Sequence, residues 1–309
     1  MLLGDAEAPS LYIGIGVNAG AKIMVVTGTA KLFGKPRDQL TRLKETCFKG
    51  DTSITVGEGL DWVAGDRIVL FATAIQHDHF DYRTIESYDS DTGVVVLTEA
   101  LDFYHYGKAS STANDYNGVD MRGEVALLNR NVRVVGEDLD TWGGQITVQD
   151  VFEETGDFRT GMLLMDSVEV ANCSQRGTFN AAIRIENAVT QHHQITNSAI
   201  HGSRAWGISL LKSDNIFIEN THVIGARALG TVVQSSNNVT MNKMITANVI
   251  RRDEISMNHV MDTEACFSIC TAFGGSHACN DVTVTNSIAA GCVYSGFVVA
   301  GHDCDDDAD

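Results

Sequence analysis

The sequence predicts an all-β protein built around a solenoid, in which short strands stack rung upon rung. The first observation is an internal repeat: residues 197–210 (NSAIHGSRAWGISL) align with residues 220–233 (NTHVIGARALGTVV) after a shift of 23 positions, from 197 to 220. A period in the low twenties with short β-like runs is typical of solenoids. The second observation is a turn-rich composition, because the 309 residues include 29 glycines and only 2 prolines.

Asparagine recurs where the predicted strands end. Asparagine tolerates left-handed backbone conformations, and side-chain amides one strand spacing (~4.8 Å) apart can hydrogen-bond along a stack. We therefore predict a structural asparagine ladder at a tight bend between two sheets. One rung places its asparagine, Asn242, one residue early, and the 66 residues between positions 220 and 286 predict three rungs there. The ladder residues in one frame are Asn172, Asn197, Asn220 and Asn286.

The charge of the chain bears on its partners. It carries 22 lysines and arginines against 40 aspartates and glutamates, a formal net charge of −18. Nucleic-acid binding depends on lysine and arginine contacts to phosphates, so we expect no nucleic-acid partner. The charge is compatible with calcium or with basic partners. No apolar run reaches the ~18 residues that a membrane-spanning helix requires.

Cysteines are concentrated near the end of the chain. Five of the seven lie between Cys266 and Cys304, and none forms a CxxC pair. We expect disulfides that staple the C-terminal rungs, and hence an oxidising compartment; the alternative is reduced, buried thiols in the solenoid. The odd number implies a partner outside the chain or one free thiol. Of two glycosylation sequons, at Asn172 and Asn238, we expect Asn238 to be the one modified.

The first half also consists of strand-like segments, at 22–26, 52–56, 67–71 and 93–97. Residues 62–70 (WVAGDRIVL) resemble the strand hallmark of the eight-glycine domain, and residues 119–134 (VDMRGEVALLNRNVRV) resemble the signature at its end. These segments follow one another in the order expected for this domain, and the resemblance covers nearly the whole chain. The chain resembles the extracellular part of the fibrocystin and fibrocystin-like family, whose relatives include transmembrane protein 2 and the cell-migration-inducing hyaluronan-binding protein.

This resemblance implies a right-handed parallel β-helix after the eight-glycine domain. We expect residues 1–136 to be that domain, incomplete at its N-terminus, and residues 137–309 to be β-helix repeats, incomplete at their C-terminus. The resemblance further implies an extracellular or cell-surface location, with a membrane anchor outside this fragment.

Asp120, Arg122 and Glu124 share one face of a strand, because side chains alternate along it. Together with Arg130 they form one candidate site. They can bind the carboxylate of a sugar, or they can be a structural ion network that locks the module to the first rungs.

His77 and His79, with residues 104–106 (YHY), form a second candidate site for a ligand. Neighbouring histidines and aspartates can bind a metal or transfer protons, and aromatic rings beside carboxylates suit sugars. Consecutive residues point to opposite faces of a strand, so a single metal cannot take all of them.

Arg204 and Arg227 are predicted to stack one rung apart, near His201. If this site is catalytic, the arginines bind acidic sugars and His201 acts as a base. However, no carboxylates are paired at matching positions of adjacent rungs, as a glycoside hydrolase requires. We expect Trp206 to fill the core.

The acidic C-terminal end, with Asp303, Asp305 and Asp307, can bind calcium through oxygen ligands or can be a solvated tail. Calcium is the one cofactor that we consider.

We therefore expect an extracellular structural or recognition fragment of a fibrocystin-like surface protein, which contributes to a cell-surface coat, adhesion or filament assembly. The expected partners are other extracellular proteins, copies of the same chain, or glycans. The alternatives are an enzyme that binds or depolymerises a hyaluronan-like polysaccharide, and a calcium-dependent glycan binder.

Overall fold

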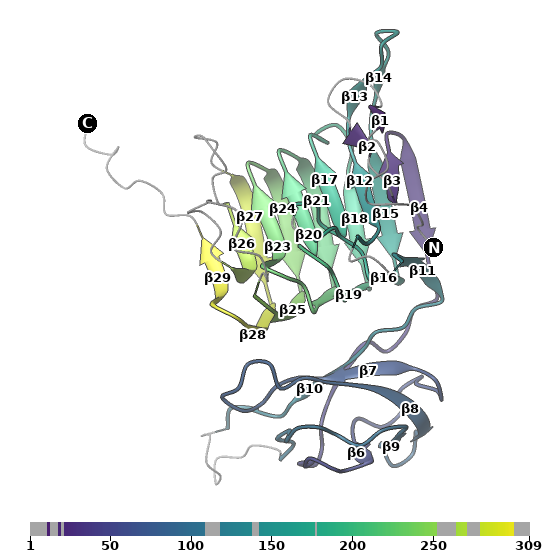
Figure 1. The fold of residues 1–309 in the computed structure, drawn as a ribbon, viewed down its shortest axis with the longest axis vertical. Helices are drawn as coiled ribbons and strands as arrows, with labels where there is room; N and C mark the ends of the chain where they lie inside the picture. Colours follow the sequence, from purple (N-terminus) through teal and green to yellow (C-terminus); the bar gives the residue numbers. More distant parts are fainter. Residues whose placement is uncertain are drawn as a thin grey trace, which may run out of the picture.

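The computed structural model describes residues 11–12, 18–19, 22–108, 118–137, 142–176, 178–251, 264–270 and 279–299. Within these residues every regular element is a β-strand. Figure 1 shows a solenoid of stacked strands with an antiparallel module packed against one side of it. The prediction of an all-β parallel β-helix is confirmed, since the strands of the solenoid pair in parallel with their neighbours one rung away.

The solenoid has three sheets, which we call face 1, face 2 and face 3. Face 1 holds β3 (Ile23–Val26), β12 (Gln145–Val148), β17 (Ile183–Glu186), β20 (Ile208–Leu211), β23 (Leu229–Gln234), β26 (Ala265–Ile269) and β29 (Ser295–Val299). Face 2 holds β4 (Thr29–Phe33), β15 (Met162–Asp166), β18 (His193–Thr196), β21 (Asp214–Glu219), β24 (Asn237–Asn242) and β27 (Asn280–Thr285). Face 3 holds β11 (Val132–Val135), β16 (Val168–Ala171), β19 (Ala199–His201), β22 (His222–Ile224), β25 (Ile245–Val249) and β28 (Ile288–Cys292).

Alternating residues of these strands point inward and stack in columns. Ile146, Ile183 and Ile208 occupy equivalent positions of three successive strands of face 1, and each is completely buried. Each side chain therefore contacts its equivalents one strand spacing above and below, which forms a continuous apolar core along the solenoid.

The module lies inside the first rung. β3 pairs with β12, and β4 pairs with β15, so residues 23–33 already belong to the solenoid. The chain then leaves to form the module and returns at β11, which pairs with β16. This arrangement differs from the sequence-based division at residue 136. The first two strands precede the module in the chain, and their partners β12 and β15 follow it. The paired strands are therefore separated by more than a hundred residues, and a local pattern does not connect them.

The module is a sheet with strand order β5-β10-β7-β8-β9-β6, and all of its pairings are antiparallel. Its own core includes Leu43, Ile68, Ile85, Val95 and Val125. Its strands are β5 (Leu40–Arg42), β6 (Ser53–Thr55), β7 (Arg67–Leu70), β8 (Asp81–Asp89), β9 (Val94–Leu97) and β10 (Glu124–Leu127). Two short antiparallel pairs lie elsewhere: β1 (Leu11–Tyr12) with β2 (Asn18–Ala19), and β13 (Val151–Phe152) with β14 (Phe158–Arg159).

The module covers face 3 of the solenoid. Strand β7 alternates, so that Ile68 points into the core of the module whereas Val69 packs toward the solenoid. Phe80 of the module joins the same interface cluster as Ile224 and Ile245 of face 3. Because these side chains are nearly fully buried, the two parts share one apolar interface.

The corners between faces use left-handed residues. Asn197, Asn220 and Asn286 follow strands of face 2 and have φ of 50°, 46° and 50°. Asn220 Nδ2 donates to Asn197 Oδ1 (2.8 Å), so the amides bond along the stack. In the rung with the early asparagine, Lys243 takes the left-handed position (φ 52°), and Asn242 Oδ1 instead accepts from Asn286 Nδ2 (2.9 Å).

Two predictions about the repeat are wrong. Asn172 (φ 53°) follows β16 on face 3, so it lies at a different corner from the other ladder residues. In that rung, the residue at the corner after face 2 is Ser167 (φ 56°). The short run before Asn172 has the same apolar alternation as the face 2 strands, which explains the error. In addition, β24 pairs directly with β27, so no further rung intervenes between them. The extra residues lie before and after β26 instead.

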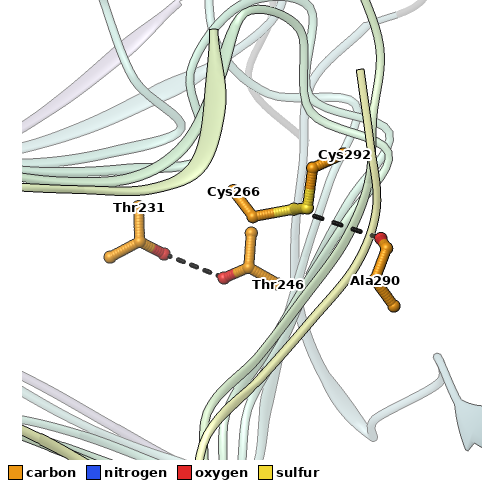
Figure 2. Close-up of a disulfide and its surroundings, with 5 residues drawn as sticks. All are labelled: Thr231, Thr246, Cys266, Ala290 and Cys292. Carbon is orange, nitrogen blue, oxygen red and sulfur yellow. Dashed lines mark hydrogen bonds between the residues drawn. A yellow bond between two sulfur atoms is a disulfide. The ribbon is translucent and has the colours of Figure 1, made fainter. Parts of the chain in front are cut away.

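A disulfide links the last rungs. Cys266 of β26 and Cys292 of β28 are bonded, with Cα atoms 5.6 Å apart. Figure 2 shows the cystine beside Thr231 and Thr246, whose hydroxyl oxygens are 3.2 Å apart in the interior. This pair confirms the predicted disulfide in the C-terminal rungs. Cys47, Cys173, Cys270 and Cys279 are thiols, and Cys304 lies outside the described residues.

Candidate functional site

The joint between the module and face 3 is centred on one carboxylate. In β16, Val168 and Val170 point into the solenoid, and the intervening Glu169 therefore points toward the module. The Glu169 side chain is completely buried. Its oxygens accept from Arg133 Nε (2.8 Å) and Nη2 (3.1 Å) and from Arg67 Nη2 (2.5 Å).

Two further hydrogen-bond donors complete this cluster. One comes from the segment that leads from the module back to the solenoid, and the other comes from the next rung. The main-chain nitrogen of Arg130 donates to Glu169 Oε2 (3.2 Å), and Nε2 of His201 lies 3.0 Å from Oε1. Burial raises the pKa of the Glu169 carboxyl, but the hydrogen bonds from His201, Arg133 and the Arg130 amide outweigh it and lower the pKa to about 2. Glu169 is therefore ionised at neutral pH and is unsuited to be a general acid.

A cleft of about 150 Å³ opens beside this cluster, between β7 and β8 of the module and β19. Arg67, Tyr82, Arg83 and His201 are among its lining residues. The Tyr82 hydroxyl accepts from Asn248 Nδ2 (2.8 Å), which ties the module strand to the solenoid corner. The cleft thus has walls from both parts of the molecule.

Arg130 links the module to the solenoid through buried hydrogen bonds. It is only 3% exposed, and its guanidinium donates to Gln39 Oε1 (2.6 Å) and to the carbonyl oxygens of Leu127, Asn129 and Asn197 (3.1, 2.8 and 3.1 Å). Burial lowers the pKa of Arg130 to about 10, with a further contribution from the charge of Arg37. Arg130 therefore bonds the module directly to the corner at which the asparagine ladder begins.

His222 is the second buried imidazole of face 3. It is completely buried, and neither ring nitrogen has a hydrogen-bond partner among the described residues. Burial, together with the charge of Arg130, lowers the pKa of His222 to about 3. His222 is accordingly neutral at physiological pH.

Asp120, Arg122 and Glu124 come together around Arg42 of β5. Arg42 pairs with Asp120 (2.6 Å) and with Glu124 (2.9 Å), and Arg122 pairs with Asp120 (2.8 Å). The Arg122 hydrogen bond holds the pKa of Asp120 well below its usual range. This network joins β5 to the β10 region inside the module. Of the four predicted residues, Arg130 is the one whose side chain hydrogen-bonds to a rung within the described part of the chain.

The histidines of the second candidate site are separated. The ring of His79 stacks on Phe103 with centroids 4.1 Å apart. His105 is fully buried and bonds Asp81 (2.8 Å) and the Phe71 carbonyl (2.8 Å). The peptide oxygen of His77 lies close to Gly291, which has φ 61°. This segment therefore contributes to packing against the solenoid.

Arg204 and Arg227 follow the corners after β19 and β22, on the way back to face 1, whereas His201 faces the module. Burial and the neighbouring Arg227 lower the pKa of Arg204, which is consistent with the predicted stacking one rung apart. Trp206 is 1% exposed and packs on Phe179, with ring centroids 5.3 Å apart.

A groove of about 240 Å³ lies on the outer side of face 1. Arg184 Nε donates to Glu186 Oε2 (2.8 Å), and Arg184 Nη1 donates to Asn180 Oδ1 (3.0 Å). The groove therefore combines aromatic rings with fixed polar groups. Its lining includes Phe179, Arg184, Glu186, Trp206, Lys212 and Gln234.

The described residues contain no group of three or more histidine, cysteine, aspartate or glutamate side chains arranged to bind a metal. Asp303, Asp305 and Asp307 lie outside the described residues. Asn238 is exposed, and its Nδ2 donates to Asn215 Oδ1 (2.8 Å); its glycosylation stays a prediction. In the described part of the chain there is also no helix long and apolar enough to span a membrane.

The chain is similar over part of its length to fibrocystins and to G8 domain-containing proteins. It is 36% identical to mouse Fibrocystin-L over 164 residues (52% of this chain and 4% of the relative) and 25% identical to human Fibrocystin-L over 236 residues (71% and 6%). A G8 domain-containing protein of Dictyostelium discoideum is 28% identical over 112 residues (35% and 9%). The chain is fibrocystin-like and carries a G8 domain. It thus spans less than a tenth of the length of these relatives, and no protein-family model matches it.

Solved structures similar to this fibrocystin-like chain include the tailspike protein gp49 from Pseudomonas phage LKA1. That protein has 13% identity and a TM-score of 0.26, over 88% of this chain and 47% of the other.

Sequence patterns missed the centre of the joint in this fibrocystin-like chain. Glu169, Arg67 and Arg133 were not singled out, although Glu169 is the one charge within the run Val168–Ala171. An acidic residue on a strand whose outer face is covered by another part of the chain needs partners. That signal becomes visible only when the covering module is known.

Proposed function

We propose that this fibrocystin-like chain is an extracellular recognition segment that binds saccharides without cleaving them, in the groove on face 1. The observation that supports this proposal is the lining of the groove. The aromatic ring of Phe179, which packs on the buried Trp206, offers apolar surface for the C–H face of a sugar, and Arg184 and Lys212 offer polar groups for its hydroxyls. The volume is below the ~300 Å³ of common small-molecule sites, so we expect one sugar ring to enter.

The absence of cleavage rests on the carboxylates. Glu186 is the single carboxylate among the described residues that line the groove, and it is already paired with Arg184. Glycoside hydrolysis uses two carboxylates on opposite sides of the bond. At the joint, Glu169 is fully buried and engaged by its donors. These arguments favour recognition over the alternative of a depolymerising enzyme.

We further propose that this recognition takes place at the cell surface, where it contributes to a coat, to adhesion or to filament assembly. The module covers face 3, and faces 1 and 2 extend along the solenoid beside it. A solenoid of this kind presents extended surfaces to other proteins or to copies of itself.

Saccharide binding can be tested with the purified 309-residue chain on a panel of immobilised neutral and acidic oligosaccharides. Arg184→Gln and Phe179→Ala remove groups from the groove, and Gln194→Ala on face 2 is the matched control. We expect binding to fall at least tenfold in the two groove variants and to be unchanged in the control. The length of soluble oligosaccharides after incubation is measured in parallel. Equal binding by all variants, or shortening of the oligosaccharides, would overturn the proposal.

A further inference from the structure

We propose that the cleft at the joint between the module and face 3 binds an oxyanion, namely a carboxylate or sulfate group. This site is separate from the groove on face 1 and does not depend on the proposed function. It is formed by Arg67 of β7 and His201 of β19, and therefore exists only when the module is docked.

The first argument is the unused hydrogen-bonding capacity of the two residues. Arg67 uses Nη2 for Glu169, and its Nε and Nη1 have no partner in the described part of the chain. Its side chain is 40% exposed, so these donors are accessible. A guanidinium presents donors in a planar fork that matches the oxygens of a carboxylate or sulfate. Arg67 can therefore hold an anion with one edge and Glu169 with the other.

The second argument is the protonation of His201. Glu169 is ionised, so its oxygen can only accept, and Nε2 of His201 must carry the proton of their hydrogen bond. Nδ1 has no partner among the described residues. It is an acceptor in the neutral ring and becomes a donor when the ring is protonated. Nδ1 therefore faces the cleft without a partner in the described chain, and in the protonated ring it can donate to an anion.

The third argument is the local charge. The guanidinium groups of Arg67 and Arg133 bond one carboxylate, Glu169, and the charge of Arg130 also interacts with it, which leaves two positive charges in excess within this group. Arg130 itself bonds carbonyl oxygens and the amide of Gln39, so no other carboxylate neutralises it directly.

The surrounding groups offset this excess. Arg37, Asp61 and Asp66 also act on Arg130 and together add one negative charge. The other ionisable residues that line the cleft are Tyr82 and Arg83. Arg83 is paired with Asp81 and Asp102, and this group adds a second negative charge. The surroundings of the cleft are therefore neutral in a chain with a net charge of −18, so an anion meets less repulsion there than the charge of the whole chain would give.

The test is isothermal titration of sodium sulfate, sodium glucuronate and glucose into the full chain, at pH 5.5 and pH 7.5 and constant ionic strength. Arg67→Lys keeps the charge beside Glu169 but loses the fork. His201→Gln keeps an amide donor for Glu169 but removes the imidazole Nδ1 from the cleft. Arg159→Gln, in the β13–β14 hairpin, is the matched control, and a thermal melt of each variant shows that it is folded.

We expect saturable binding of at least one anion, weakened tenfold or more in Arg67→Lys and unchanged in Arg159→Gln. His201→Gln should also weaken the binding. Tighter binding of glucuronate supports an acidic sugar as the ligand, whereas binding of sulfate alone supports a sulfate group. The inference is overturned if neither anion binds saturably, if glucose binds equally well, or if both variants bind as the unaltered chain does.

Discussion

The imidazole of His201 and the carboxylate of Glu169 lie 3.0 Å apart on neighbouring strands of face 3, beneath the G8 module. The pair is held from three directions. β16 and β19 position it from the solenoid, and Arg67 reaches it from β7 of the module. A single carboxylate thus links three rungs, those of β11, β16 and β19, and an inserted module. Its contacts make the stability of the joint sensitive to charge and pH.

Replacement of Glu169 by glutamine should destabilise the fold by about 3 kcal/mol, because loss of one partner from a buried ionic cluster leaves the other charges uncompensated. This value lies at the low end of the losses typical of buried ion pairs, because the side chains of Arg67 and Arg133 are partly exposed to solvent. Urea denaturation at pH 7 measures the effect. Glu153→Gln, which breaks an exposed pair with Arg159, should cost less than about 1 kcal/mol. Equal losses in the two variants would contradict the central role of Glu169.

The stability should decrease as the pH falls below 6.5, in part because of His222. The pKa of this imidazole is about 3 in the folded chain, against an ordinary value of 6.5. The folded state therefore binds fewer protons than the unfolded state between these values, and the free energy of unfolding drops by about 1.4 kcal/mol per pH unit. Measurements between pH 6.5 and 5 exclude Glu169, which begins to lose its contribution only below pH 4.5, the ordinary value of its pKa. His193, whose pKa is also lowered by burial, contributes in the same direction.

His222→Leu is the matching variant for this experiment. It removes the titrating group from the interior and retains an apolar side chain of similar size. Urea denaturation over the same pH range should show a flatter dependence than in the unaltered chain. An unchanged slope would assign the acid sensitivity to other groups.

Arg130→Lys should loosen the joint, even though the charge is retained. The guanidinium makes hydrogen bonds to Gln39 and to three main-chain carbonyls, and an ammonium group cannot reproduce this planar geometry. We expect a loss of about 2–3 kcal/mol, since buried acceptors remain without donors. Hydrogen exchange should be faster in β16 and β19 and unaltered in β27. Arg159→Lys, on the exposed hairpin, should have no measurable effect.

Removal of the disulfide should destabilise the last rungs. Cys266 and Cys292 are 26 residues apart, and closing a loop of this length stabilises a fold by about 3.5 kcal/mol in the chain-entropy model. Cys266→Ala combined with Cys292→Ala should lower the melting temperature in the absence of reductant. A reductant should lower the melting temperature of the unaltered chain and leave the double variant unchanged. If the reductant affects both equally, another thiol pair is responsible.

The repeat itself was predictable, because the solenoid stacks equivalent residues and Asn197 and Asn220 differ by one rung. The exceptions have physical causes. Asn172 follows a strand with the same alternation but belongs to another corner, and only the pairing of β16 with β19 distinguishes the two. The spacing between Val239 and Val282 includes insertions around β26, so a regular period overcounts the rungs.

The candidate site was predictable only in part. His201 and Arg130 were singled out, but their common partner Glu169 was not, because it resides in a different rung and its relevance depends on contact with the module. Asp120, Arg122 and Glu124 did gather, but the prediction that they share one face of a strand is wrong, because Asp120 and Arg122 precede β10. Arg42, around which they gather, comes from β5, and sequence spacing alone does not reveal such a cross-strand partner.

The position of the module within the first rung has a consequence for how such proteins can be dissected. The two chain crossings into the module lie side by side, since the main-chain nitrogen of Lys35 donates to Asn131 Oδ1 (2.6 Å). The module is thus a cassette with adjoining ends, and a short peptide could replace it without breaking the rung. A truncated chain starting at residue 137 would instead lose β3, β4 and β11 together, and would expose the bare edges of all three faces to other strands.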